Sequence, residues 1–78
     1  MTAQKDQAFD TLELVIGKLQ GELGRNPTTP EILTRLALVT GIYIGGAAAE
    51  SQDPEGFVFR AVQPITSGAL DVYHELAK

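Results

Sequence analysis

The chain has 78 residues, no cysteine, and six Lys and Arg against ten Asp and Glu, which gives a formal net charge of -4. This length predicts one small domain over residues 1–78, and without cysteines neither disulfides nor thiolate metal sites can reinforce its core. Because phosphate binding depends on clustered cations, the acidic balance and the scattered basic residues argue against nucleic acid or an anionic membrane as a partner.

An amphipathic helix is predicted from about residue 3 to residue 23. Its apolar residues recur at alternating steps of three and four, which places them in one stripe along a helix. They are Phe9, Leu12, Ile16, Leu19 and Leu23. Leu14 projects almost opposite this stripe, beside Lys18. These two residues are either an ordinary exposed pair or a secondary interaction face.

A turn and a second helix follow, the helix covering about residues 30–50. Gly24 is a natural helix stop, and the residues after it are typical of a turn. Thr29 is expected to cap the second helix with its hydroxyl group. Pro30 fits the first helical position, and Glu31 suits the positive end of the helix dipole.

The second helix is apolar on every side. One face consists of Ile32, Leu36, Val39, Tyr43 and Ala47. The opposite face consists of Leu38, Gly41, Ile42, Gly45 and Ala49, and no charged residue lies between Arg35 and Glu50. A helix that is apolar all round must be covered all round, which two neighbouring helices cannot do. We therefore predict that the second of these faces is an interaction face.

Glycines inside this helix carry a cost that needs an explanation. Gly41, Gly45 and Gly46 together disfavour the helix by about 2.5 to 3 kcal/mol relative to alanine. Gly41, Gly45 and Ala49 form a small-xxx-small stripe, which allows a second backbone to approach closely and offset the cost. The alternative is that Gly45 and Gly46 break the element, although the alanines that follow favour a continuous helix.

A third helix is predicted over about residues 54–77. Asp53-Pro54-Glu55 repeats the sequence of cap, proline and acid expected at the second helix. One apolar stripe then continues past Pro64 to the C-terminus, which favours a helix over a strand. It comprises Val58, Val62, Ile65, Ala69, Val72 and Leu76. The fold class is therefore all-α, a small bundle of three helices, or four if the chain breaks near Gly45-Gly46 or Pro64.

The sequence offers little for catalysis or for metal binding. The single histidine, His74, shares a helix side with Asp71, but a zinc site needs three or four ligands. Ser51 and Ser67 lack the glycine-flanked turn of an activated nucleophile. We expect no enzyme, no metal and no cofactor.

A resemblance concerns "GELGRNPTTPEILTRLAL", residues 21–38. This segment is similar to the helical hairpin in the third region of bacterial sigma factors and to helix-turn-helix proteins generally. The resemblance implies that Thr29 to Leu38 form the first helix of such a unit. Ala37 stands where a turn glycine is usual, and "VTGIYIGGAAAE" has no basic or amide residue for a recognition helix. The resemblance thus supports an αα connection rather than DNA binding.

The function expected from these features is protein–protein interaction. The chain reads as a small acidic cytoplasmic protein that forms a homodimer or higher homo-oligomer, and as a bacterial or phage accessory or inhibitor protein. One alternative is a helix-turn-helix-like DNA-binding regulator. Another is a small-ligand-binding protein with a pocket between subunits, lined by aromatic residues that are more often part of a core. These are Tyr43, Phe57, Phe59 and Tyr73.

Overall fold

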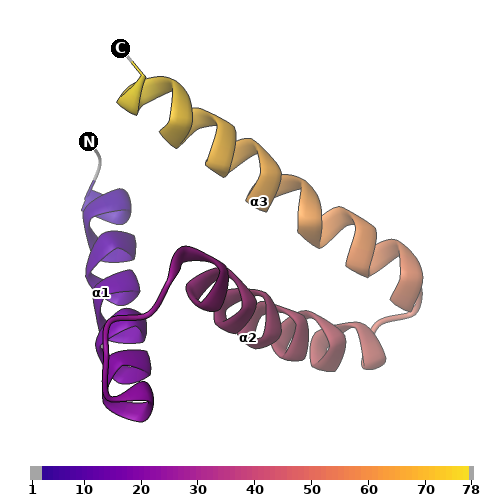
Figure 1. Cartoon of the computed structure of the whole chain (residues 1–78). Helices are drawn as coiled ribbons and strands as arrows, with labels where there is room; N and C mark the ends of the chain where they lie inside the picture. The colour runs from indigo at the N-terminus through magenta and orange to yellow at the C-terminus, as the bar shows by residue number, and fades with distance from the viewer. Residues whose placement is uncertain (1–2, 78) are drawn as a thin grey trace. The chain divides into compact units, whose positions relative to one another are not determined.

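The computed structural model of the chain describes residues 3–77, and this part is all-α, with three helices and no strand. Helix α1 spans Ala3–Leu23, α2 spans Thr29–Ala49 and α3 spans Pro54–Leu76 (Figure 1). Each end lies within one residue of its predicted position. Met1, Thr2 and Lys78, which the predicted domain includes, lie outside the described residues.

The second and third helices are continuous at the two positions where the sequence allowed a break, Gly45-Gly46 and Pro64. Helix α2 passes through Gly45 and Gly46 without interruption, and α3 contains Pro64 in its interior. Three consecutive alanines after the glycines are strong helix formers and carry α2 to Ala49. In α3 a proline removes one backbone donor, and the regular turns on either side maintain the helix. The alternative with four helices is therefore wrong.

Gly24 ends α1 in the way that the sequence predicted. Its φ of 71° lies in the left-handed region, where a residue with a Cβ atom is strained. Its N–H donates to the carbonyl of Gln20 at 2.8 Å, which satisfies one of the free carbonyls at the helix end.

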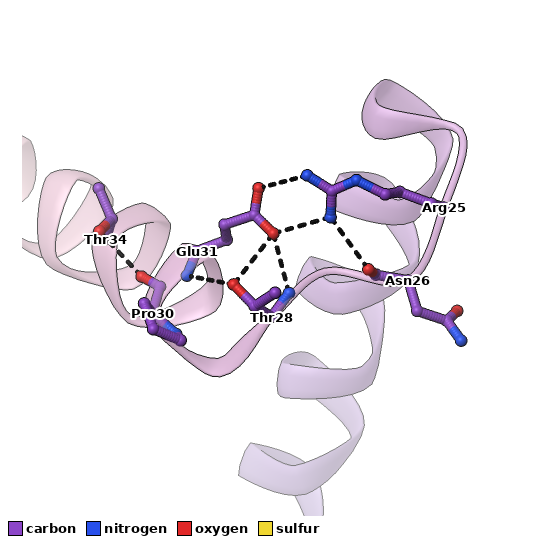
Figure 2. A network of polar contacts seen from close by, with 6 residues as sticks. All are labelled: Arg25, Asn26, Thr28, Pro30, Glu31 and Thr34. Atoms are coloured by element: carbon purple, nitrogen blue, oxygen red, sulfur yellow. Dashed lines mark hydrogen bonds and ion pairs between the residues drawn. The ribbon is translucent and has the colours of Figure 1, made fainter.

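The start of α2 differs from the prediction by one residue. Thr28, and not Thr29, caps the helix: its hydroxyl accepts a hydrogen bond from the Glu31 N–H at 3.3 Å. The Glu31 carboxylate in turn accepts from the Thr28 N–H at 2.9 Å (Figure 2). This reciprocal capping box needs threonine and glutamate three positions apart, a spacing that Thr28 has and Thr29 lacks. Pro30 therefore occupies the second helical position.

The start of α3 agrees with the prediction. The Asp53 carboxylate accepts a hydrogen bond from the Gly56 N–H at 3.3 Å, and Pro54 is the first residue of the helix. The Asp53 carbonyl accepts the first helical hydrogen bond, from the Phe57 N–H at 2.9 Å. Because Pro54 lacks an N–H, it fits a position where that donor would have no helical partner.

The chain forms two compact units, Met1–Leu38 and Val39–Lys78. In the first, α1 and the N-terminal part of α2 bury one described side chain, Leu19, which is 4% exposed. Leu12 and Ile16 of the predicted stripe are half-buried, whereas Phe9 and Leu23 are exposed. The core of this unit is therefore narrow.

In the second unit, the rest of α2 and α3 bury one described residue, Ala48. No residue of α3 is buried, although its predicted apolar stripe is continuous. Val58, Val62 and Ile65 are 39%, 45% and 50% exposed. A large part of the apolar surface that the sequence provides on α3 is thus left uncovered by its own unit.

Candidate interaction face

In the second unit, α2 has one covered side and one open side. The covered side consists of residues spaced three and four apart that are buried or half-buried: Thr40, Ile44, Ala47 and Ala48. The remaining side chains of this part of the helix, Val39 to Ala49, are exposed. Glu50 and Ser51 follow as a turn, and the Ser51 hydroxyl donates to the Ala48 carbonyl at 2.9 Å.

The predicted face lies on the open side. Gly41, Gly45 and Ala49 are exposed and lie one turn apart along α2. No atom of the described residues comes within 4 Å of a Cβ placed on Gly41 or Gly45, apart from chain neighbours and the backbone of the helix itself. Ile42, beside this stripe, is 76% exposed. Nothing in the described chain therefore occupies the space that the glycines leave open.

Leu38, the fifth predicted residue of the face, belongs to the first unit and has a different environment. Its side chain is 59% exposed and lines an open groove between α1 and the start of α2. The other residues that line this groove are Leu19, Leu23, Pro30, Glu31, Thr34 and Arg35. Leu38 therefore contributes to a surface of the first unit, whereas Gly41, Ile42, Gly45 and Ala49 form a surface of the second.

The charged residues of α2 are confined to its first two turns, where both are paired. Arg25 binds Glu31 through two hydrogen bonds of 2.9 and 2.8 Å (Figure 2). Arg35 binds Glu22 of α1 through two of 2.9 and 3.1 Å. The stretch from Leu36 to Ala49 carries no charge. No charged side chain of α2 therefore lies at the face formed by Gly41, Ile42, Gly45 and Ala49.

These ion pairs shift the pKa values of their members. The Arg25 guanidinium, with the N–H and hydroxyl of Thr28, lowers the pKa of Glu31 from 4.5 to about 2. The hydrogen bonds from Arg35 lower the pKa of Glu22, and the carboxylates raise the pKa values of Arg25 and Arg35. All four groups hold their charges in fixed pairs at neutral pH, so they act as structural elements of the α1–α2 connection.

The secondary face on α1 is exposed in the structure. Leu14 is 75% exposed, and Lys18 is also exposed. Around Gly17 and Gly21, on the same side of the helix, the residues that the structure describes place no atom within 4 Å of an added Cβ, apart from chain neighbours and the helix backbone. Leu14 is the only large apolar side chain on this part of the surface, which is the pattern of an ordinary exposed leucine.

Three aromatic residues lie where the sequence interpretation did not place them. The sequence favours core positions for Tyr43, Phe59 and Tyr73, yet they are 79%, 74% and 64% exposed. The interpretation is wrong for these three, whereas Phe57 is half-buried. Phe59 and Tyr73 lie beside the apolar stripe of α3 and not within it. This position in the helical pattern could have indicated that they form a separate apolar surface.

Within residues 3–77, no three His, Cys, Asp or Glu side chains lie close enough together to hold a metal ion. His74 lies beside the Tyr73 ring, with centroids 5.6 Å apart and planes inclined by 51°. Among the described residues, exposed apolar side chains are therefore the feature on which a candidate site can be built.

Helix α2, with 21 residues, is also long and apolar enough to cross a membrane by length and composition alone. Core helices of soluble proteins, which are mostly buried, and signal sequences near an N-terminus have the same length and composition. The uncharged part, Leu36–Ala49, is about 21 Å long at 1.5 Å per residue. The hydrocarbon layer of a bilayer is about 30 Å thick, so a spanning α2 would draw Arg35 and Glu31 into it.

The chain matches no protein-family model, and no curated protein and no solved structure is significantly similar to it.

Proposed function

We propose that this chain is a small, acidic, non-catalytic protein–protein interaction module that self-associates through the open side of α2. The face consists of Gly41, Ile42, Gly45 and Ala49. The observation that carries the proposal is the empty space over Gly41 and Gly45, next to an isoleucine that is 76% exposed. An apolar helix surface of this kind is stable in water when another surface covers it.

A second copy of the chain is the partner that this chemistry favours. Glycines without neighbours let two helices approach backbone to backbone, and the same small residues on both partners suit a symmetric contact. Each copy carries a net charge of -4, but the face itself is uncharged. Two copies can therefore meet there without placing like charges next to each other. Close contact also accounts for the glycines, which otherwise only weaken the helix.

The DNA-binding alternative has weaker support. Helix α2 continues from Thr29 to Ala49, so the turn that the resemblance implies after Leu38 is not formed. A helix-turn-helix unit presents a separate second helix to the major groove, and its affinity depends on clustered cations. Both Arg25 and Arg35 are already paired with carboxylates.

The test compares two leucine substitutions by light scattering. Gly45→Leu places a large side chain on the face, while Gly68→Leu places the same side chain on α3, away from the α2 face. Among the described residues, no atom beyond chain neighbours and the backbone of the helix itself lies within 4 Å of the Cβ position of either leucine, and both variants gain similar helix propensity. We expect a wild-type mass that is a multiple of 8.3 kDa. Gly45→Leu should lower this mass at least twofold, and Gly68→Leu should preserve it.

Far-UV circular dichroism on the same samples establishes that both variants remain helical. A wild-type mass of 8.3 kDa at every concentration would contradict the proposal. So would a Gly45→Leu variant that is helical and has the wild-type mass.

A further inference from the structure

Helix α3 carries a second uncovered apolar surface, separate from the α2 face. Phe59, Val62, Leu70 and Tyr73 are 74%, 45%, 52% and 64% exposed. With Thr66 at its centre, which is also exposed, this set occupies one side of the helix within an arc of about 80°. We call these five residues the aromatic ridge of α3.

The spacing of the ridge is symmetric about Thr66. Val62 and Leu70 lie four residues before and after it, and Phe59 and Tyr73 lie seven before and after. In an antiparallel pair of identical helices, a two-fold axis at one residue brings each position opposite the position equally far on the other side. An axis at Thr66 would therefore place Phe59 against Tyr73 and Val62 against Leu70.

We propose that the aromatic ridge binds the same ridge of a second copy of the chain, antiparallel, with the two-fold axis at Thr66. The inference concerns a different surface from the proposed α2 contact and can hold or fail independently of it. Each pair would join an aromatic ring with an aromatic ring and an aliphatic side chain with an aliphatic one. Such matched pairs are what a self-complementary contact between helices requires.

The two aromatic rings of the ridge supply between a quarter and almost half of the area that each partner of a standard dimer interface buries. A fully buried aromatic side chain covers about 150–250 Å², so Phe59 and Tyr73 at their exposures together offer about 200–350 Å². A standard interface buries about 800 Å² on each partner. Val62 and Leu70 add to the rings, as do the exposed side chains that flank the ridge, Val58, Ile65 and Leu76.

Charge and polarity also suit a second copy. Arg60 and Asp71, the charged residues between Phe59 and Tyr73, lie about 120–140° around the helix from Thr66. Pro64 lies almost opposite Thr66, so its ring does not obstruct the contact. The Thr66 hydroxyl donates to the Val62 carbonyl at 3.4 Å and can be covered without losing this partner.

The chain has no cysteine, so single cysteines test the geometry directly. Packed helices lie about 8–10 Å apart, and their backbones have a radius of about 2.3 Å, so facing Cα atoms at the axis lie within disulfide range. The full chain with Thr66→Cys should form a disulfide-linked dimer under mild oxidation at least tenfold faster than the chain with Ser67→Cys. Position 67 is exposed and lies about 100° around the helix.

Val62→Cys and Leu70→Cys test the orientation. A mixture of these two variants should form the mixed disulfide at least tenfold faster than either variant forms its own dimer. Equal rates for Thr66→Cys and Ser67→Cys would overturn the proposal. Faster linkage of Val62→Cys to itself than to Leu70→Cys would overturn the antiparallel arrangement.

The Thr66→Cys experiment is repeated in the Gly45→Leu background to separate the two contacts. Retained linkage there supports the α3 contact even if the α2 face fails. Loss of linkage in this background, with helicity intact, would overturn the α3 contact as an independent interface. If Gly45→Leu lowers the mass while Thr66→Cys never links, the α2 contact stands and the α3 contact is refuted.

Discussion

At the scale of single residues, the turn between α1 and α2 shows how much a short motif determines. The Gly24 stop and the Asp53 cap were predictable, because glycine and aspartate have well-defined roles at helix ends. The α2 cap was also readable, since Thr28 and Glu31 have the capping-box spacing. The prediction chose the wrong one of two adjacent threonines, Thr29 in place of Thr28. The ion pair between Glu22 and Arg35 joins residues 13 positions apart, and only the packing of α1 on α2 reveals it.

The cap assignment is tested by replacing the two threonines separately. Thr28→Ala removes the hydroxyl that accepts the Glu31 N–H and should destabilise the chain by about 1 kcal/mol. Thr29→Ala removes a hydroxyl that does not cap the helix and should change stability by less than about 0.5 kcal/mol. Urea unfolding at one fixed chain concentration measures both. If Thr29→Ala destabilised the chain more than Thr28→Ala, Thr29 would be the residue that caps α2.

The Glu31 carboxylate predicts a dependence of stability on pH. Its pKa is about 2 in the folded chain and 4.5 ordinarily, so the unfolded chain binds the proton more readily. The stabilisation is therefore complete above about pH 4.5 and is lost as the pH falls towards 2. Glu31→Gln should reduce the melting temperature at pH 7, and its difference from wild type should shrink as the pH falls from 5 to 2.

Glu22→Gln is the matched comparison, because Arg35 lowers the pKa of Glu22 in the same direction. The difference between Glu22→Gln and wild type should therefore also shrink as the pH falls. A Glu31→Gln difference that stays constant from pH 7 to pH 2 would show that the carboxylate charge contributes nothing to stability.

At the scale of the helices, periodicity and caps predicted the elements but not which of their sides are covered. The 3.6-residue pattern marks a residue as apolar and assigns it to a side of the helix. It does not say whether another helix reaches that side. Tyr43 and Val39 continue the face that begins with Ile32 and Leu36, yet they are exposed while the earlier two are half-buried. The covered sides depend on how helices pack, which no single segment encodes.

Two glycines of α3 provide a matched pair for stability. Gly68→Ala adds a methyl group in open space and should stabilise the helix by about 0.8–1 kcal/mol. At Gly56 the added Cβ would collide with the capping carboxylate of Asp53. The propensity gain there should be offset by loss of the cap, about 1 kcal/mol, leaving little net change. Urea unfolding that shows equal stabilisation by both variants would mean that Asp53 does not cap α3.

At the scale of the whole molecule, the chain has more apolar helix surface than its two units bury. Leu19 and Ala48 are the described residues classed as buried, whereas fifteen large hydrophobic side chains are exposed. The sequence predicted a surplus around Gly41 and Gly45 because charge is missing from the middle of α2. It did not reveal the ridge on α3, because Phe59 and Tyr73 read as ordinary core residues. Association of several copies would cover both surfaces and would make stability depend on concentration.

The most direct test of the α2 contact is an isotope-filtered nuclear Overhauser experiment on equal amounts of labelled and unlabelled chains. Its readout is the set of cross-peaks between protons of different chains. We predict intermolecular cross-peaks from the Hα protons of Gly41 and Gly45, and they should vanish in Gly45→Leu and persist in Gly68→Leu. Wild-type chains that give no intermolecular cross-peak at these glycines, at a concentration where the measured mass is a multiple of 8.3 kDa, would contradict self-association through α2.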